Sequence, residues 1–299
     1  MNALIYNAEM EAPRLKCVDT GEVRIAAWEW PGEEPALVFS HATGFHGRVW
    51  DAVARRFSGR RRVAIDHRGH GRSGKPAPPY RWDAFGRDLR DVVEALSLGG
   101  AIAIGHSMGG HSAAAAHDVF SALLLIDPTI FTRELYGSPF ADMSFVRRRR
   151  NRWKSPDEMF ESFRERPPFA SWQPEVLRDY CEFGLLEEGD AFVLACPPEF
   201  EASIYEHSRH PSSNIYEQFP ATTQPVTVMR SARPMKEGVV DMTASPTAPD
   251  LASRFPDARD VWVRDSDHFI PMTRPDLVAE EITALISRRR GSNAAPARP

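Results

Sequence analysis

The stretch AIAIGHSMGG at residues 101–110 decides how this chain is expected to fold. Its first four residues are small or apolar and suit a short buried strand. Gly-x-Ser-x-Gly follows at residues 105–109 and turns the chain sharply, and the small residues after it are compatible with a helix. Strand, tight turn and helix in this order place the Ser107 hydroxyl at the carboxyl end of a strand, ready to act as a nucleophile. A glycine-rich turn with a passive serine is the alternative.

Length and composition limit the class of protein. The 299 residues, 42% of them hydrophobic, suffice for one large α/β domain or a core with an insertion. A net charge of −4 gives no reason to expect nucleic acid or an anionic membrane as a partner. Three widely spaced cysteines do not predict a disulfide framework. The first fourteen residues lack the apolar core of a signal peptide, and no apolar run reaches the length of a membrane span, so we expect a cytoplasmic protein.

Apolar runs and helical patterns alternate over most of the chain. Residues 15–19 and 22–28 predict a hairpin, and the last helix is expected at 275–289. Alternation of strands with helices predicts a mostly parallel sheet with helices on both faces. Buried strands are expected at residues 36–39, 62–65, 101–104, 122–126, 225–229 and 261–263.

Residues 131–219 interrupt this alternation. The segment is rich in proline and contains helical patterns but no clear buried strand. We therefore expect a helical cap at 131–219, inserted into an α/β core formed by residues 1–130 and 220–299. The helical candidates are residues 133–153, 156–166, 174–186 and 198–208.

A serine nucleophile needs a general base, and His268 is the candidate. Histidine suits this role because its pKa lies near neutral pH. His268 comes just after the last predicted strand, so its loop should open at the same edge of the sheet as Ser107. A solvated loop histidine is the alternative. We expect His106 to pack or hydrogen-bond beside the turn and His41 to hold its own loop in place.

The oxyanion of a tetrahedral intermediate needs two fixed N–H donors. The backbone N–H of Met108 is one candidate, because it stands at the start of a helix. The other should come from the loop after the strand at 36–39. We favour Thr43 in that loop, with Ala42 as the alternative.

Four motifs together resemble the α/β-hydrolase superfamily in order and spacing. They are SHATGF at residues 40–45, DHRGHGRS at 66–73, GHSMGG at 105–110 and DHF at 267–269. The resemblance covers about residues 20–130 and 220–290. It implies a Ser–His–acid triad under a helical cap, at the position of the expected insertion. One departure is Ala42, which follows His41 where the superfamily usually has glycine.

The resemblance also guides the search for the acid of the triad. Most relatives carry it in the loop after the strand that follows the cap, but Pro234 stands at that place here. Some members instead carry the acid after the strand that follows the nucleophile helix, which corresponds to Asp127. We therefore expect Asp127, with Asp241 as the alternative because a longer loop could bring it to His268.

These residues predict a serine hydrolase that cleaves an ester, thioester or lactone bond of a small, partly apolar substrate through an acyl-enzyme. The same triad could serve carbon–carbon bond hydrolysis or cofactor-free perhydrolysis, and the same fold could form a non-catalytic ligand-binding protein. No cofactor or metal is expected, since nucleotide-binding loops and metal-ligand spacing are missing from the sequence. The oligomeric state stays open. The arginines at 147–150 fit a solvated helix face, an acidic partner or a carboxylate-bearing substrate.

Overall fold

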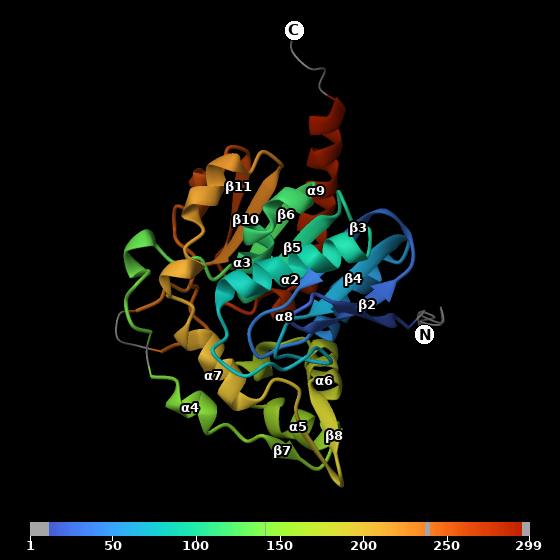
Figure 1. The fold of residues 1–299 in the computed structure, drawn as a ribbon, viewed down its shortest axis with the longest axis vertical. Helices are drawn as coiled ribbons and strands as arrows, with labels where there is room; N and C mark the ends of the chain where they lie inside the picture. Colours follow the sequence, from blue (N-terminus) through green and yellow to red (C-terminus); the bar gives the residue numbers. More distant parts are fainter. Residues whose placement is uncertain (1–11, 141, 237–239, 295–299) are drawn as a thin grey trace, which may run out of the picture.

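The structure, a computed structural model, describes residues 12–140, 142–236 and 240–294, with only the backbone for 290–294. Most of the N-terminal stretch expected not to be a signal peptide, residues 1–11, lies outside these ranges. An eight-stranded sheet in the order β1-β2-β4-β3-β5-β6-β10-β11 forms the centre of the molecule (Figure 1). Its strands are β1 (Arg14–Asp19), β2 (Arg24–Trp30), β3 (Glu33–Ser40), β4 (Arg60–Asp66), β5 (Ile102–His106), β6 (Ala122–Ile126), β10 (Val226–Ser231) and β11 (Ala258–Val263).

Most of the sheet is parallel, as the sequence predicts. Strands β1 and β2 form the expected antiparallel hairpin, and β2 also pairs antiparallel with β4. All neighbours from β4 to β11 pair in parallel. The carboxyl ends of six strands therefore meet at one edge of the sheet, where ligands of α/β proteins commonly bind.

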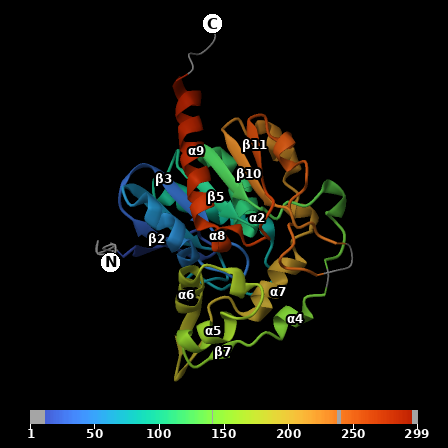
Figure 2. The same cartoon turned by 180° about the vertical axis from the view of Figure 1, so that it is seen from behind.

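Helices cover both faces of the sheet (Figures 1 and 2). One face carries α2 (Trp82–Ala95) and α3 (Met108–Ala115), and the other carries α1 (Asp51–Ala54), α8 (Ile270–Thr273) and α9 (Pro275–Ala294). The short helix α1 lies between two 3₁₀ turns, Gly47–Trp50 and Arg55–Phe57. None of the described helices is long and apolar enough to cross a membrane.

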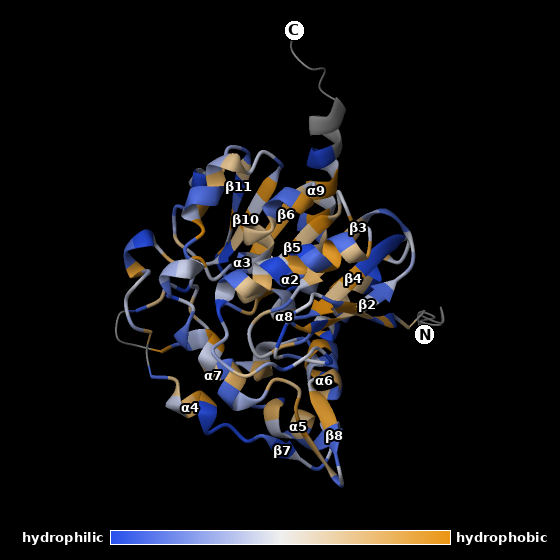
Figure 3. Ribbon diagram, viewed as in Figure 1, coloured by the Kyte–Doolittle hydropathy of each residue, from blue (hydrophilic) through white to orange (hydrophobic). Residues whose placement is uncertain are grey.

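The core lies on both faces of the central strands, which are the most hydrophobic part of the ribbon (Figure 3). In β3, Leu37 and Phe39 pack toward α1 and α9, whereas Val38 packs with the residues under α2. All three side chains have no exposed surface. A strand buried on both faces needs apolar side chains at successive positions, which is why these segments are continuous apolar runs in the sequence.

Residues 144–206 lie together over the carboxyl edge of the sheet (Figure 1), whereas Ile215, Tyr216 and Phe219 pack in the core beside Val226. Four helices occur in this segment, yet the expectation of helices alone is wrong, because it also contains a small antiparallel sheet in the order β7-β9-β8. The predicted helix at 174–186 stops at Gly184, and the chain then turns back through Gly189 at φ +65°. The elements are α4 (Ser144–Arg147), β7 (Arg152–Trp153), α5 (Pro156–Phe163), α6 (Pro174–Phe183), β8 (Leu185–Glu188), β9 (Ala191–Leu194) and α7 (Pro198–Glu206).

The turn between β5 and α3 has little space. Ser107 has φ +56° and ψ −118°, a conformation that costs free energy for any residue with a side chain. A Cβ atom on Gly105 would overlap the carbonyl of Gly109, and one on Gly109 would overlap the carbonyl of Ser40. Both glycines are therefore required, because the helix start approaches β3 and β5 at backbone contact.

The Gly109→Ala substitution tests this close packing. Alanine is the better helix former by about 1 kcal/mol at an ordinary helix position. Here we expect the opposite sign, with the free energy of unfolding lowered by about 2 kcal/mol or more, since the methyl group would displace the end of β3.

Urea unfolding measures this difference, and Gly99→Ala is the matched control because an added Cβ there meets no atom within 4 Å. Equal stability of the Gly109→Ala and Gly99→Ala proteins would contradict the interpretation.

Candidate active site

Ser107, His268 and Asp127 form a continuous hydrogen-bonded chain. His268 Nε2 lies 3.0 Å from Ser107 Oγ, and His268 Nδ1–H donates to Asp127 Oδ2 over 2.7 Å. Ser107 stands on the turn after β5, Asp127 directly follows β6, and His268 lies in the loop after β11. The sheet order brings these three strand ends to one edge. In this arrangement Nε2 is free to accept the serine proton, because the proton of the neutral imidazole is on Nδ1.

Asp127 is fully buried and receives donors from several segments of the chain. Its Oδ1 accepts from the backbone N–H of Ser231 at 3.0 Å, from Ser245 Oγ at 2.5 Å and from Thr247 Oγ1 at 3.3 Å. A buried carboxylate is costly unless donors replace water. The last residue of β10 and the loop after this strand thus supply donors to the carboxylate that follows β6.

Asp241, the alternative acid, also lines the same cavity but holds different partners. Its Oδ1 accepts from the hydroxyl and the backbone N–H of Thr243 at 2.6 and 2.9 Å, and its Oδ2 lies 2.8 Å from Arg233. These contacts, led by the Thr243 hydroxyl, hold the pKa of Asp241 below its usual value. The Thr243 carbonyl accepts from the backbone N–H of His268 at 2.9 Å, so Asp241 supports the loop that carries the imidazole.

Neutral histidines fix the loops around Ser107. His41 donates from Nδ1–H to the Ala42 carbonyl and accepts at Nε2 from the backbone N–H of His67, as its expected anchoring role requires. His70 accepts from the backbone N–H of Gly44, and burial lowers the His70 pKa to about 4. His106 donates to the carbonyl oxygen of His268 at 2.9 Å, consistent with the contact predicted for it beside the turn.

The candidate oxyanion donors belong to two segments, residues 42–43 and the residue that directly follows Ser107. Met108 is the first residue of α3, so its N–H has no partner inside the helix. Within the described ranges, the backbone N–H groups of Met108, Thr43 and Ala42 donate to no other protein group. Thr43 and Ala42 both line the cavity at Ser107, so the position of the loop is compatible with either residue as second donor.

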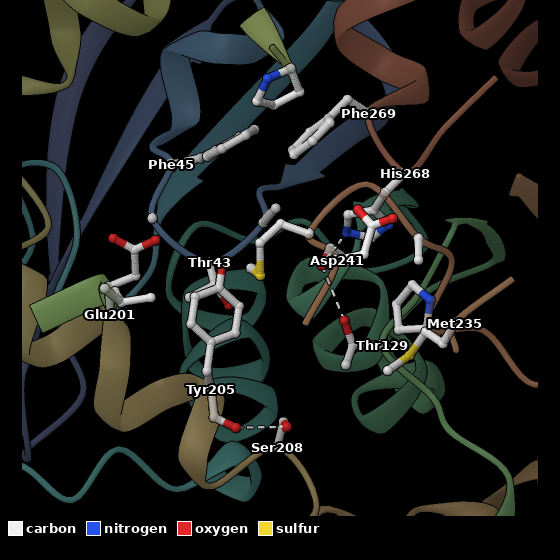
Figure 4. A pocket seen from close by; sticks show the side chains of 18 of the residues that line it. Thr43, Phe45, Thr129, Glu201, Tyr205, Ser208, Met235, Asp241, His268 and Phe269 are labelled. Atoms are coloured by element: carbon white, nitrogen blue, oxygen red, sulfur yellow. Dashed lines mark hydrogen bonds between the residues drawn. The ribbon is translucent and has the colours of Figure 1, made fainter. Parts of the chain in front are cut away.

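A cavity of about 290 Å³ opens at Ser107 and His268. Its wall is mostly apolar, with many aromatic side chains, and comes from the core loops and from residues 131–219 (Figure 4). Such a cavity fits a small, partly apolar molecule. The aromatic lining residues are Phe45, Trp82, Phe131, Phe140, Phe145, Phe163, Phe169, Trp172, Tyr180, Tyr205 and Phe269.

Sequence reasoning did not single out Thr129, whose hydroxyl lies 3.1 Å from Ser107 Oγ (Figure 4). The Thr129 backbone N–H also donates to the Ser107 carbonyl at 3.0 Å. Its position two residues after Asp127 is a signal that could have found it, because both residues leave the same strand at the edge where Ser107 stands.

The basic stretch at residues 147–150 is largely paired with acids. Arg149 alone among these arginines lines the cavity, where its Nη1 lies 2.7 and 2.5 Å from the two carboxylate oxygens of Glu201. Sequence reasoning missed Glu201, since its partner lies 52 residues away in the chain. Outside the cavity, Arg147 pairs with Glu199 and Glu206, Arg150 with Glu158 and, just beyond the stretch, Arg152 with Glu188.

Comparison with known proteins places this geometry in a family. The model of the "Alpha/beta hydrolase family" matches residues 37–281. The chain is 24% identical to 2-(acetamidomethylene)succinate hydrolase of Mesorhizobium japonicum over 281 residues, 90% of this chain and 94% of that protein. It is 38% identical to a non-heme chloroperoxidase of Burkholderia pyrrocinia, over only 33% of this chain and 36% of that protein.

Solved structures share the fold across nearly the whole chain. The crystal structure of E-2-(acetamidomethylene)succinate hydrolase superposes with a TM-score of 0.70 and 23% identity, covering 92% of this chain and 99% of that one. At this identity the superposition supports the fold alone. The family match spans most of the sequence, and this protein is therefore an enzyme of the alpha/beta hydrolase family.

Proposed function

We propose that the enzyme is a serine hydrolase that cleaves an ester, thioester or lactone bond of a small, partly apolar substrate through an acyl-enzyme. One observation carries the proposal: the hydrogen-bonded chain from Asp127 through His268 to Ser107 ends in a mostly apolar cavity of about 290 Å³. Nucleophile, base and orienting acid within hydrogen-bond distance are what acyl transfer requires.

In the first half-reaction Ser107 Oγ attacks the carbonyl carbon while His268 Nε2 takes the hydroxyl proton. Asp127 keeps the imidazole in the required tautomer and stabilises the imidazolium that forms. His268 then gives the proton to the leaving oxygen or sulfur as its bond to the carbonyl carbon breaks. Water attacks the acyl-enzyme in the second half-reaction, His268 takes its proton, and the acid is released as Ser107 recovers the proton.

The negative charge of the tetrahedral intermediate falls on the carbonyl oxygen. Met108 N–H and Thr43 N–H stabilise it, with Ala42 N–H as the alternative to Thr43. Preset donors of this kind cost no reorganisation during the reaction, and each one commonly contributes about 3 kcal/mol to the transition state. The buried loop histidines support the proposal, because they hold residues 41–44 in position without carrying charge.

Perhydrolysis without a cofactor and carbon–carbon bond hydrolysis are the other reactions that the same three residues could perform. The partial similarity to a non-heme chloroperoxidase favours the first of these as second candidate. Its distinguishing measurement is peracid formation from a carboxylic acid and hydrogen peroxide. The cytoplasmic location expected from the sequence stays a prediction.

Replacement of Ser107 by alanine tests the nucleophile. We expect kcat for p-nitrophenyl esters of short acids to fall by roughly 10⁴-fold or more, because the attacking oxygen is lost. A fluorophosphonate probe should label the wild-type enzyme at Ser107, as mass spectrometry of the labelled peptide would report. An unchanged melting temperature controls for folding, and full activity of the alanine variant would refute the proposal.

The acid is tested by comparing Asp127→Asn with Asp241→Asn. Asparagine at 127 cannot hold the productive imidazole tautomer, so we expect kcat to fall by roughly 10²- to 10⁴-fold. Asparagine at 241 removes the partly exposed negative charge that contacts Thr243 and Arg233. We therefore expect a far smaller loss of kcat. Steady-state kinetics on one ester measures both variants. A larger loss in Asp241→Asn than in Asp127→Asn would move the acid to position 241.

A further inference from the structure

The wall of this mostly apolar cavity includes an ion pair, Arg149 with Glu201. Nη1 of the arginine makes both contacts, at 2.7 and 2.5 Å, and Tyr180 lies beside the guanidinium. Both members line the cavity. A guanidinium has five N–H groups in a fixed plane, so donors remain on Arg149 for a ligand.

The accessible part of the pair belongs mainly to the arginine. The Arg149 side chain is 28% exposed, whereas that of Glu201 is 6% exposed. Arg147 and Arg150 of the same stretch pair with acids that do not line the cavity. An arginine that served only to keep the surface solvated would not need to point into the cavity. A desolvated ion pair also contributes little net stability to the fold.

The pair adjoins the loop that carries the oxyanion donor. A Cβ added to Gly44 would lie 2.9 Å from Glu201 Oε1, so the carboxylate rests directly on the residue after Thr43. Figure 4 shows Glu201 on the side of Thr43, with His268 across the cavity from it. Because His268 must protonate the leaving group, the leaving group occupies the His268 side. An acyl group that extends away from His268 enters the part of the cavity lined by Glu201.

The charge of the pair restricts what it can bind. The charges of Arg149 and Glu201 compensate each other in a mostly apolar cavity. A carboxylate brought to Arg149 would place a second negative charge beside Glu201, at a high desolvation cost. An uncharged oxygen can accept from the guanidinium without this cost, and a hydroxyl can also donate to Glu201.

We propose that Arg149 and Glu201 select acyl groups that carry an uncharged carbonyl or hydroxyl oxygen a few bonds from the scissile carbonyl, and that they exclude acyl groups ending in a carboxylate. This inference rests on the proposed serine-hydrolase function and adds the substrate class. In this inference Arg149 binds an uncharged oxygen and does not attract a carboxylate-bearing substrate.

Three ethyl esters with acyl groups of similar size test the proposal: pentanoate, 4-oxopentanoate and the monoester of succinate. Acid release in a pH-stat gives kcat/KM for each. We expect the wild-type enzyme to prefer the 4-oxo ester over pentanoate by about tenfold, which corresponds to one hydrogen bond from a charged donor. We expect the succinate monoester to be at least about tenfold poorer than pentanoate.

Two variants should change the order of kcat/KM among the three esters. Glu201→Gln leaves the Arg149 charge uncompensated, so the ratio of succinate monoester to pentanoate should rise by about tenfold or more over the wild-type ratio. The double variant Arg149→Met/Glu201→Gln has no charge, so the 4-oxo ester and pentanoate should react within about twofold of each other. Melting temperatures show that each protein is folded.

Arg150→Met is the matched control, because Arg150 belongs to the same stretch, pairs with Glu158 and does not line the cavity. The ratios of kcat/KM between the three esters should equal those of the wild type.

A wild-type preference for the succinate monoester would overturn the inference. Equal ratios of kcat/KM in the wild type and the double variant would overturn it too. In both cases Ser107-dependent hydrolysis of ethyl pentanoate would still support the proposed function. Failure to hydrolyse any of the three esters while Ser107 is labelled by the probe also overturns the inference alone. Absence of both hydrolysis and labelling would reject the proposed function.

Discussion

The geometry around Ser107 depends on the buried carboxylate of Asp127. It ties the end of β6 to the end of β10 through the Ser231 N–H, to the following loop through Ser245, and to the loop after β11 through His268. Each of these groups is buried or nearly so, and each would lose its partner if the carboxylate were absent. A single side chain thus sets the relative positions of three loops, and the imidazole lies 3.0 Å from Ser107 Oγ as a consequence.

The predictable parts of this protein are those written in short stretches of sequence. Continuous apolar runs such as residues 122–126 predict strands buried on both faces, and the glycines around Ser107 predict a turn that admits no side chain. His268 could be associated with Ser107 because both follow strands whose carboxyl ends share one edge. Proline has no carboxylate, so Pro234 cannot be the acid at the position where most relatives carry it, and this made Asp127 the expected acid.

The parts that escaped prediction depend on partners distant in the chain. The β8–β9 hairpin consists of two four-residue, half-buried strands around Gly189. Strands this short have too few apolar residues to be recognised in the sequence between two helical patterns. Thr129 has no motif of its own and gains its contact with Ser107 only when β5 and β6 pair. Arg149 cannot be distinguished from the adjacent arginines in sequence, since only the folded chain shows which guanidinium turns inward to Glu201.

The order of the strands has a consequence for how such enzymes diversify. Strands β6 and β10 are immediate neighbours in the sheet, although about a hundred residues separate them in sequence, so the chain leaves the core and returns to it between two adjacent strands. Segments of other lengths could be exchanged at this junction without altering the strand pairing of the eight-stranded sheet. About half of the residues that line the cavity could thus be replaced by recombination, while Ser107, Asp127 and His268, all outside residues 131–219, would stay unchanged.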